Sequence, residues 1–469
     1  MADYDVVIIG TGAAGLAAAA VLVRGGYTVA LVEARERVGG RVHTIRPPLA
    51  TLPVELGADF VHGRPPEVFS IAEEAGLRLY EHTGTSWVAL GGRLQSDEDE
   101  AAGEDDPDDN EDEDGDDVSA IFAAIEGWQG EDRSLQDLFD ARFAGERWAR
   151  ARQRVSRYVE GFDAADVDRV SVAWLQQAEL ASDAMDGNRQ FRVLDGYDRV
   201  LTWLSDGLGT AADLRLQTVA REIRWRRGHA EVRLESPAGV PLGAISARVA
   251  LITVPLGVLK RSFDDPETPG AVRLTPEPPG KREALARLGM GHAVKVVLRF
   301  RLIFWDALPQ ELRPDHKLVS LPQFSFMFAD DPVIPTWWTA HPVVAPLLTG
   351  WTAGPRAARL ANASDEAIAD EAVAALSRVL GIERDDLNKL LVGKHTHNWS
   401  ADPFSSGGYS YVYTGGLSAP AMLAEPVEET LFFAGEATNT EGDTGTVHGA
   451  LQTGYRAGEA IARALVEHG

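Results

Sequence analysis

The chain has 469 residues, of which 45% are hydrophobic, and this is enough for two or three domains with apolar cores. It contains no cysteine, which excludes disulfide bonds, thiolate catalysis, cysteine-ligated metals and a cysteinyl-flavin bond. No stretch approaches the roughly 18 to 20 apolar residues of a membrane span, and the start MADYD is acidic rather than basic. We therefore expect no signal peptide, no membrane span and a cytoplasmic location.

The formal net charge of −26 is concentrated in one segment. Residues 97–117 hold fifteen Asp or Glu and no Lys or Arg, so the rest of the chain carries only −11. Such a run cannot bury itself, and we expect a disordered surface insertion; the alternative is an acidic arm that attracts cationic substrates or partners. Residues 142–162 carry many arginines, with Val155 and Val159 at helical spacing. We expect a helix whose basic face pairs with the acidic segment, rather than a nucleic-acid-binding element.

The first predicted unit is a strand, a glycine turn and a helix. Val6–Ile9 is an apolar β-branched run, typical of a strand buried on both faces of a parallel sheet. Gly10, Gly12 and Gly15 follow in the spacing G-x-G-x-x-G and precede an alanine-rich helix. Gly10 permits the tight turn, Gly12 lets a pyrophosphate approach the backbone, and Gly15 lets the helix pack closely on the strand. This order predicts a dinucleotide-binding unit.

An acid ends the second predicted strand, residues 27–32. Glu33 follows the glycines at roughly the expected distance of about 20 residues, placed to accept hydrogen bonds from an adenosine ribose. An acid there disfavours a 2′-phosphate, because two negative charges would meet. FAD or NAD is therefore favoured over NADP.

Further along the chain the hydrophobic pattern alternates between helices and strands. Residues 64 to about 194 are mostly helical in pattern, interrupted by the acidic segment. The pattern then predicts, in order, a helix, a meander, two strands, an amphipathic helix, a strand and a glycine-led helix, over residues 194–208, 214–236, 247–259, 289–305, 364–381, 430–435 and 444–467. Because ligands in a doubly wound sheet sit beyond the carboxyl ends of the strands, Gly435, Glu436 and a helix N-terminus at Gly449 suit a second set of cofactor contacts.

Five ordered segments resemble the flavin-dependent amine oxidases, the family of monoamine oxidases, polyamine oxidases and lysine-specific histone demethylases. They are the dinucleotide glycines with EARERVGGRVHT (33–44), ELGADFVHG (55–63), the lysine of GHAVKVVLRF (291–300), NWSADPFSSGGYSYV (398–412) and FFAGEATNTEGDTGTVHGALQTG (432–454). The resemblance covers nearly the entire chain. The swirm and tower modules of the histone demethylases have no visible counterpart in it.

The resemblance implies an α/β fold in which a Rossmann-type FAD-binding domain is joined to a second, mixed α+β substrate domain. This is the two-domain fold shared with p-hydroxybenzoate hydroxylase. We place the discontinuous FAD-binding domain in residues 1–84, 195–285 and 395–469, and the substrate-binding domain in residues 85–194 and 286–394.

The resemblance also implies which residues hold FAD. In the family, the segment R-x-G-G-R after the acid wraps the pyrophosphate and the flavin, and nicotinamide enzymes have no such need. The implied contacts, together with the dinucleotide glycines, are Glu33, Ala34, Arg35, Gly39, Gly40, Arg41, Gly57, Ala58, Val219, Trp399, Gly435, Glu436, Thr446 and Val447. In monoamine oxidases a cysteine anchors the flavin covalently; Gly408 stands at that position here, so we expect noncovalent FAD.

Four residues form the candidate catalytic set. Lys295 interrupts an apolar strand, where an ammonium is costly unless it is neutralised or paired; in the family this lysine holds a water against flavin N5. The alternative is an edge-strand lysine whose head reaches solvent. Tyr409 matches one of the two aromatic rings that enclose the substrate in many relatives, but Thr446 stands where the other would be. His62 lies near the flavin in polyamine oxidases, and a satisfied structural histidine is its alternative.

Other candidates are aromatic residues for an apolar lining, acids for a distal ammonium, and histidines for a metal. The aromatic candidates, each with plain core as the alternative, are Trp337, Trp338, Trp351 and Phe324. The acids are Asp59 and Asp195. His395 and His397 suggest a metal, but no third ligand is evident in the sequence, so we predict no metal site.

The implied reaction passes a hydride equivalent from the α-carbon of a neutral amine to flavin N5. It gives an imine that water hydrolyses to an aldehyde and ammonia or a smaller amine, while O2 reoxidises the flavin to give H2O2. Because burial lowers the pKa of an ammonium, an apolar site yields the neutral amine with little help from a general base.

We predict an oxidase of primary amines or polyamines, with a small-molecule amine and O2 as partners and no nucleic acid. Two alternatives are a flavin oxidase or desaturase of the same fold acting on an amino acid or another substrate, and a non-enzymatic flavoprotein scaffold for basic partners. The sequence leaves the oligomeric state open.

Overall fold

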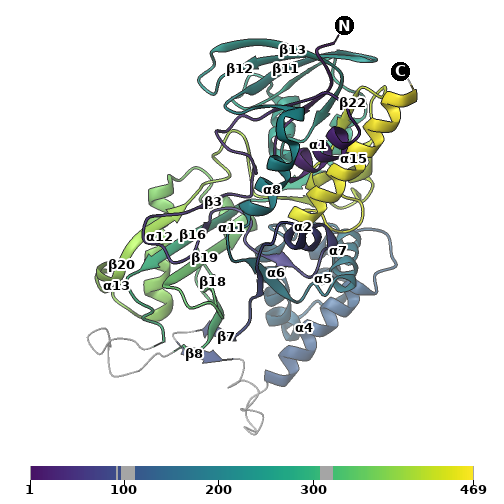
Figure 1. Cartoon of the computed structure of the whole chain (residues 1–469). Helices are drawn as coiled ribbons and strands as arrows, with labels where there is room; N and C mark the ends of the chain where they lie inside the picture. Colours follow the sequence, from purple (N-terminus) through teal and green to yellow (C-terminus); the bar gives the residue numbers. More distant parts are fainter. Residues whose placement is uncertain (1, 91–92, 97–110, 307–320, 468–469) are drawn as a thin grey trace.

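The computed structural model describes residues 2–90, 93–96, 111–306 and 321–467. Figure 1 shows an upper region built around one sheet and two lower regions, one containing a second sheet and the other made mainly of helices. The two ends of the chain both lie in the upper region. No helix among the described residues combines the length and the apolar content needed to span a bilayer.

The first sheet contains eight strands within the described residues, in the order β10-β2-β1-β13-β12-β11-β14, with β22 paired to β13. Their bounds are β1 Tyr4–Ile9, β2 Val29–Val32, β10 Ala212–Arg215, β11 Val219–Arg226, β12 His229–Glu235, β13 Pro241–Ile252, β14 Arg273–Thr275 and β22 Leu431–Phe433. Strand β1 runs parallel to β2 and β13, whereas β11, β12 and the first half of β13 form an antiparallel meander.

Strand β1 is apolar throughout because both of its faces are covered. Val7 and Ile9 enter one core cluster, while Val6 and Ile8 enter another on the opposite face of the sheet. A strand exposed on one face would alternate with polar residues instead. The predicted two-face burial of this strand is therefore confirmed.

Helices α1 (Ala13–Arg24) and α15 (Val447–Glu467) pack side by side on this sheet (Figure 1). A Cβ added to Gly454 would lie 2.3 Å from the backbone oxygen of Ala14, so only glycine permits this approach. At Gly458 an added Cβ would lie 2.9 Å from Cβ of Val21. The contacts bring residue 14 against 454 and residue 21 against 458, so the two helices run parallel and their N-termini lie at the same end.

The second sheet has seven strands within the described residues, in the order β20-β16-β19-β18-β17-β7-β8. Their bounds are β7 Thr85–Leu90, β8 Arg93–Ser96, β16 Ala293–Phe300, β17 Phe324–Ala329, β18 Thr336–Trp338, β19 Leu347–Ala353 and β20 Leu391–Thr396. Helix α12 (Asp365–Leu380) packs on this sheet; the Ser364 side chain accepts a hydrogen bond from the Ala367 N–H at its N-terminus, and Gly381 (φ +63°) ends it.

The helical region contains α4 (Glu111–Glu126), α5 (Leu135–Arg142), α6 (Ala149–Phe162) and α7 (Val172–Ala184). Ile121 and Ile125 of α4 and Val155 and Val159 of α6 are fully or almost fully buried in the same core cluster. The remaining elements are β3 Thr44–Ile45, β4 Val54–Glu55, β5 Val61–His62, α2 Pro66–Glu74, β6 Leu79–Glu81, η1 Glu146–Trp148, β9 Gln190–Val193, α8 Asp198–Leu208, η2 Gly209–Ala211, α9 Leu256–Asp264, α10 Lys281–Ala286, β15 Leu288–Met290, α11 Gly354–Ala358, α13 Arg384–Leu390, β21 Ser410–Val412, α14 Ala419–Ala424 and η5 Glu436–Thr438.

The prediction of disorder across residues 97–117 is wrong for its last seven residues. Residues 97–110 lie outside the described part of the chain, but residues 111–117 form the start of α4. Acids are favourable in the first turns of a helix, and the buried apolar residues that follow hold this helix in place. Asp117 pairs with Arg147 at 2.8 Å, so the acidic segment does meet one arginine of the basic segment.

Two other expectations need correction. The stretch from residue 64 to 194 is not mostly helical before the acidic segment, since residues 79–96 contribute β6, β7 and β8. The strand predicted over 247–259 ends at Ile252, and α9 begins at Leu256 after Pro255. The predicted domain boundaries stay a prediction; β20 crosses the one drawn between residues 394 and 395.

Candidate active site

The glycine turn at residues 10–15 opens onto a cavity. Gly10 has φ +102°, which favours glycine. A Cβ added to Gly12 would meet no described atom within 4 Å, so this residue leaves room for a ligand at the backbone. A Cβ added to Gly15 would lie 2.1 Å from the oxygen of Gly10. Within the described residues, Gly10 and Gly12 line the cavity and Gly15 does not, so Gly15 serves the packing of the helix and not ligand contact.

Glu33 is held in position by three donors. Its carboxylate accepts hydrogen bonds from the N–H and Oγ1 of Thr11, at 3.0 and 2.9 Å, and from the N–H of Arg35 at 2.9 Å. The residue is 4% exposed and lines the cavity, as do Ala34 and, on β11, Val219. This rigid carboxylate lies where the ribose of a dinucleotide is expected.

Arg41 and Glu436 join the first and last motifs of the chain. Arg41 donates to Oε1 of Glu436 at 2.8 Å and to the carbonyl of Gly408 at 2.7 Å. The other oxygen of Glu436 accepts from Ser410 Oγ and from the Gly445 N–H. Glu436 lines the cavity, but protein donors occupy its carboxylate, so its main task is to hold this wall together.

The segments around Gly40, Gly57 and Trp399 fold tightly onto each other. A Cβ added to Gly57 would lie 1.8 Å from the carbonyl oxygen of Arg41, and one added to Gly40 would lie 3.4 Å from Cα of Gly12. Trp399 donates from Nε1 to the carbonyl of Leu56 at 2.9 Å. The remaining predicted cofactor residues in this wall, all of which line the cavity, are Arg35, Gly39, Ala58, Gly435 and Val447.

The cavity has a volume of about 1400 Å³. Sites for a single small ligand are typically about 300 to 1,000 Å³, so this one has room for a dinucleotide and a second molecule. The N-termini of both α1 and α15 line it, which places two sets of backbone N–H groups at the expected phosphates. The structure thus brings together every predicted cofactor and catalytic residue except Gly15.

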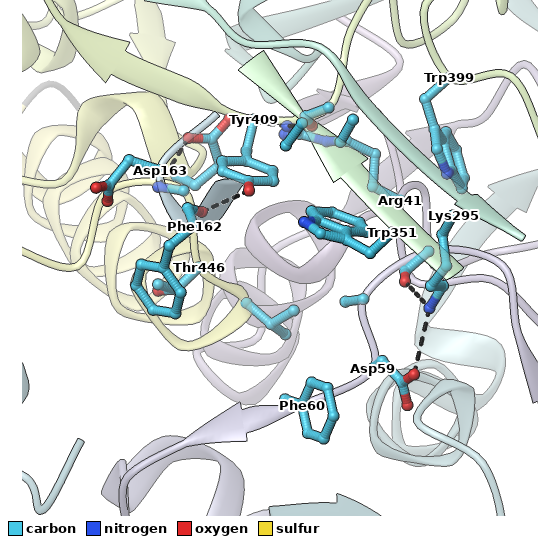
Figure 2. A pocket seen from close by; sticks show the side chains of 18 of the residues that line it. Arg41, Asp59, Phe60, Phe162, Asp163, Lys295, Trp351, Trp399, Tyr409 and Thr446 are labelled. Carbon is cyan, nitrogen blue, oxygen red and sulfur yellow. Dashed lines mark hydrogen bonds and ion pairs between the residues drawn. The ribbon is translucent and has the colours of Figure 1, made fainter. Parts of the chain in front are cut away.

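Lys295 lies on the same side of the cavity as Trp399 (Figure 2), and Gly57 also lines the cavity. It is 3% exposed on β16, between β19 and β20, so the alternative of a solvent-reaching edge lysine is wrong. Its Nζ donates to the Gly57 carbonyl at 2.5 Å and lies 3.6 Å from Asp59 Oδ2. Burial lowers the pKa of Lys295, although Asp59 opposes this shift.

Asp59, which the sequence suggested as a partner for a distal ammonium, belongs instead to a buried charge cluster. It pairs with Arg192 at 2.7 Å and accepts a hydrogen bond from Trp338 Nε1 at 3.3 Å, so it is not free for a distal ammonium. Burial alone would raise the pKa of Asp59, but Arg192 and Lys295 hold it below the ordinary value. Nearby, burial and the charge of Asp59 raise the pKa of Glu55 to about 7.

The opposite wall contains Tyr409 and Thr446, with Trp351 between the two walls in Figure 2. Tyr409 donates from its hydroxyl to the Phe162 carbonyl at 2.6 Å, and Trp351 donates to the Gly161 carbonyl at 2.8 Å. The last turn of α6 therefore fixes both rings. Thr446 donates to the Asp443 carbonyl at 2.8 Å, which orients its side chain at the start of α15.

His62 also lines the cavity, and its Nδ1 finds no partner among the described residues. Its ring meets that of Phe162 edge-on, with centroids 5.2 Å apart. Burial, together with the nearby His448, lowers the pKa of His62 to about 4, so the ring is neutral near pH 7. The alternative of a fully satisfied structural histidine is therefore wrong.

Two acids in this wall were not identified from the sequence. Asp163 and Glu179 both line the cavity. Burial and then Glu179 raise the pKa of Asp163 to about 8, and burial also raises that of Glu179. Within the described part of the chain neither carboxyl has an ion-pair partner. The sequence carries no local signal for them, since Asp163 directly follows the last residue of α6 and Glu179 lies midway along α7.

Of the aromatic candidates from the sequence, some line the cavity and others lie in the core. Trp338 and Trp351 line the cavity, whereas Trp337 and Phe324, at 0% and 2% exposure, belong to the core beneath the second sheet. Asp195 pairs with Arg78 at the surface. Of the two histidines, His397 bonds Asp402 at 2.8 Å, and among the described residues no group of three His, Asp or Glu could hold a metal.

Comparison with known proteins shows the family of the chain. Residues 13–104 and 129–462 match the model of the flavin containing amine oxidoreductases. The chain is 30% identical to polyamine oxidase 2 of Arabidopsis thaliana over 99% of this chain and 89% of that one, and 29% identical to polyamine oxidase 3 of Oryza sativa subsp. japonica over 98% and 90%. The fold matches a solved structure of wild-type putrescine oxidase bound to putrescine, with a TM-score of 0.74 and 21% identity over 98% and 99% of the two chains.

These findings agree with the geometry. The turn around Gly12, the carboxylate of Glu33 and the room in the cavity fit FAD, and the second wall offers space for a small amine. The reading as a non-enzymatic scaffold is thereby set aside. The chain belongs to the flavin-containing amine oxidoreductases, and it is an FAD-dependent amine oxidase.

Proposed function

We propose that the enzyme oxidises diamines or polyamines and uses O2 as its electron acceptor. One observation carries this proposal: Asp163 and Glu179 line the cavity, and within the described residues neither has a cationic partner. Their raised pKa values show that the protein alone does not stabilise the two charges. An ammonium bound between them would lower both pKa values and would be held in turn. The polyamine oxidases among the relatives support the same substrate class.

When bound, FAD supplies the acceptor for the hydride equivalent that leaves the α-carbon, and it passes the electrons to O2 to give H2O2. The chain must present the reacting nitrogen without its proton, because an ammonium has no lone pair to assist hydride loss. Trp351 and Tyr409 are fixed to α6 through the carbonyls of Gly161 and Phe162, and they give this part of the cavity an apolar lining. Such a lining lowers the pKa of the reacting amine.

The N–H donors of the Lys295 ammonium point in fixed directions in this wall. An ammonium has three N–H donors; one is used by the Gly57 carbonyl and a second faces Asp59. The third is left for a water molecule at the cavity. This arrangement supports the role of Lys295 in positioning water beside the flavin ring, next to Gly57 and Ala58.

Anaerobic mixing tests the substrate class. We expect 1,4-diaminobutane to bleach the flavin at concentrations at least about tenfold lower than butylamine, because only the diamine carries a second ammonium for Asp163. In air, a peroxidase-coupled assay is expected to find one H2O2 per amine oxidised. Asp163→Asn is expected to remove most of the preference, whereas Asp206→Asn, which changes an exposed acid on α8, should retain it. Equal half-saturation by the two amines would contradict the proposal.

The cytoplasmic location and the lack of nucleic-acid binding stay predictions. Fractionation of cells that express the tagged chain tests the first. A filter-binding assay with RNA and duplex DNA at low salt tests the second, and binding that falls steeply with salt would contradict it.

A further inference from the structure

A pair of aromatic rings lies at the end of α6, beside Asp163. Tyr158 and Phe162 are one helical turn apart on the same face of the helix, and both line the cavity. Their rings are nearly parallel, at an angle of 11°, with centroids 5.4 Å apart. Figure 2 shows Phe162 and Asp163 on the same side of the cavity as Tyr409. The end of α6 therefore presents aromatic surface next to an acid.

Both rings are accessible although they are large and apolar. Tyr158 is 42% exposed and Phe162 is 47% exposed. Burial, and then the charges of Asp163 and Glu179, raise the pKa of Tyr158, so its hydroxyl lies within electrostatic reach of both carboxyls. Because both rings line the cavity, a ligand meets their exposed surface. Exposed apolar groups in such a place are typical of a binding surface.

No protein cation covers these rings. Within the described part of the chain, no Lys or Arg lies over Tyr158 or Phe162, whereas Arg192 lies 5.6 Å from the centroid of Phe60 elsewhere in the cavity wall. The two acids beside the rings also have no ion-pair partner among those residues. Aromatic faces and carboxylates attract the same kind of group, a cation. We call this set the acid–aromatic corner, and it consists of Tyr158, Phe162, Asp163 and Glu179.

The rings decide which cation fits the corner best. A primary ammonium is compact and strongly hydrated, and its three N–H donors suit carboxylates without any need for aromatic surface. A nitrogen whose hydrogens are replaced by alkyl groups carries the same charge beneath an apolar surface. That surface gains from contact with aromatic faces. Two accessible rings next to two carboxyls therefore favour the alkylated cation.

We propose that the acid–aromatic corner is a subsite for an alkylated ammonium, tertiary or quaternary, at the far end of the substrate amine. The two carboxyls supply the opposite charge, and Tyr158 and Phe162 supply the faces against which the alkyl groups pack. This inference rests on the proposed oxidation of diamines and polyamines, and it specifies the chemistry of the distal nitrogen.

Two compounds that cannot be oxidised test the subsite independently of turnover. In 4-amino-N,N,N,4-tetramethylpentan-1-aminium the carbon next to the amine carries no hydrogen, and the quaternary nitrogen has no lone pair. Its isostere, 2,6,6-trimethylheptan-2-amine, has the same shape with carbon in place of the quaternary nitrogen. Titration of the FAD-loaded enzyme by calorimetry gives both dissociation constants. We expect the quaternary compound to bind at least about tenfold more tightly than its isostere.

Ring replacements assign that preference to the aromatic faces. Tyr158→Leu and Phe162→Leu keep apolar bulk, and each should reduce the preference roughly three- to tenfold, as the loss of one cation–π contact does. Tyr158→Phe keeps the ring and should retain the preference. Leucine at position 162 leaves the backbone carbonyl that holds Tyr409 in place. FAD content and melting curves show whether each variant is folded.

The matched control is Phe328→Leu. Phe328 also lines the cavity, is 49% exposed and lies nearly parallel to a second ring, that of Phe326, at 10° and 6.1 Å. Asp330, two residues further along, is paired with Arg157 at 2.7 Å, so its charge is already neutralised. This variant should keep the full preference for the quaternary compound.

Turnover sets the alkylated cation against the primary one. In the anaerobic assay, (4-aminobutyl)trimethylammonium should bleach the flavin at a half-saturating concentration about threefold or more below that of 1,4-diaminobutane. Phe162→Leu should remove this difference. An equal or higher half-saturating concentration for the quaternary amine in the parent enzyme would overturn the assignment.

The outcomes separate this inference from the proposed function. If both leucine variants keep the full preference over the isostere, the aromatic subsite is overturned, while binding of a second cation by Asp163 stands. If the preference depends on the rings but no amine with an α-hydrogen bleaches the flavin, the subsite stands and the proposed oxidation fails. Should Phe162→Leu lose FAD, the comparison of Tyr158→Leu with Tyr158→Phe decides, because only a role of the aromatic face predicts that these two variants differ.

Discussion

The two ends of the cavity differ in how their polar groups are satisfied. At the FAD end, Glu33 accepts three hydrogen bonds from Thr11 and Arg35, and Arg41 is paired with Glu436. At the amine end, Asp163 has no cation within the described residues, and His62 has an unpartnered Nδ1. The first end is complete before its ligand arrives. The second end keeps polar groups that the described residues leave without partners.

This difference follows from the demands on each end. A cofactor that stays bound through many turnovers is best held by a preorganised site, since no ordering of side chains then opposes binding. A substrate must leave as product, and binding energy is better expressed as the reaction proceeds. At the amine end, the pKa of Asp163 is raised to about 8 and that of His62 is lowered to about 4.

The largest effect is expected at the FAD end. Gly12→Val should weaken FAD binding by roughly 100-fold or more, because the side chain fills the open space through which a pyrophosphate approaches. The fold should persist, since an added Cβ meets no described atom within 4 Å. FAD content after gel filtration and circular dichroism measure the two effects. Gly207→Ala is the control on α8, with equally open surroundings, and loss of FAD there would break the comparison.

Lys295→Met tests whether this lysine, which lies between the FAD end and the amine end, acts in the reaction rather than in FAD binding. It removes the donor and keeps the apolar length, and we expect flavin reduction or reoxidation to slow roughly 100-fold while FAD content stays unchanged. Stopped-flow traces of both half-reactions, with melting curves, measure this. A Met variant as fast as the parent and more stable would show instead that Lys295 is only a costly buried charge.

Glu33→Gln is expected to have a smaller effect, confined to the FAD end. Loss of a charge-assisted ribose bond should weaken FAD binding by roughly 1.5 to 3 kcal/mol. At saturating FAD the half-saturating concentration of amine should not change. Fluorescence titration of the deflavinated enzyme measures the first quantity, and an altered amine dependence would show that the two ends are coupled.

The smallest effect concerns stability at the amine end. Because the pKa of Asp163 is raised in the folded state to about 8, the folded chain binds this proton more tightly than the unfolded chain does. Its contribution to stability is full below about pH 4 and is lost as the pH rises through about 8. The Asp163→Asn variant has no carboxyl to ionise, so its stability does not fall with rising pH in this way. At pH 9 it should therefore melt roughly 1 to 3 °C above the parent. Parallel melting temperatures from pH 5 to 9 would contradict the raised pKa.

The FAD end could be predicted from the sequence because its contacts are mostly local. Gly10, Gly12 and Glu33 lie within one β-α-β unit whose glycine spacing has one structural meaning. Gly15 shows the limit even there: it serves the turn, with an added Cβ 2.1 Å from Gly10, and not the ligand. The absence of cysteine, with Gly408 at the position that anchors the flavin in monoamine oxidases, excludes a cysteinyl-flavin bond.

The amine end could not be predicted because its partners are far apart in the chain. Asp59 meets Arg192 across 133 residues and Trp338 across 279, so no local pattern marks Asp59 as already paired. Asp163 acquires its raised pKa from burial beside Glu179, which only the packing of α6 and α7 creates. Strands β7 and β8 form a local hairpin that the prediction of a mostly helical stretch missed, and β7 also pairs with β17, which lies far along the chain.

The ion pair between Arg41 and Glu436 joins residues 395 positions apart. Gly435, Glu436 and the start of α15 line the cavity beside this pair. The β-α-β unit that displays the glycine turn and Glu33 therefore holds only part of the flavin-binding wall. The flavin site closes only when two segments separated by most of the chain have folded against each other.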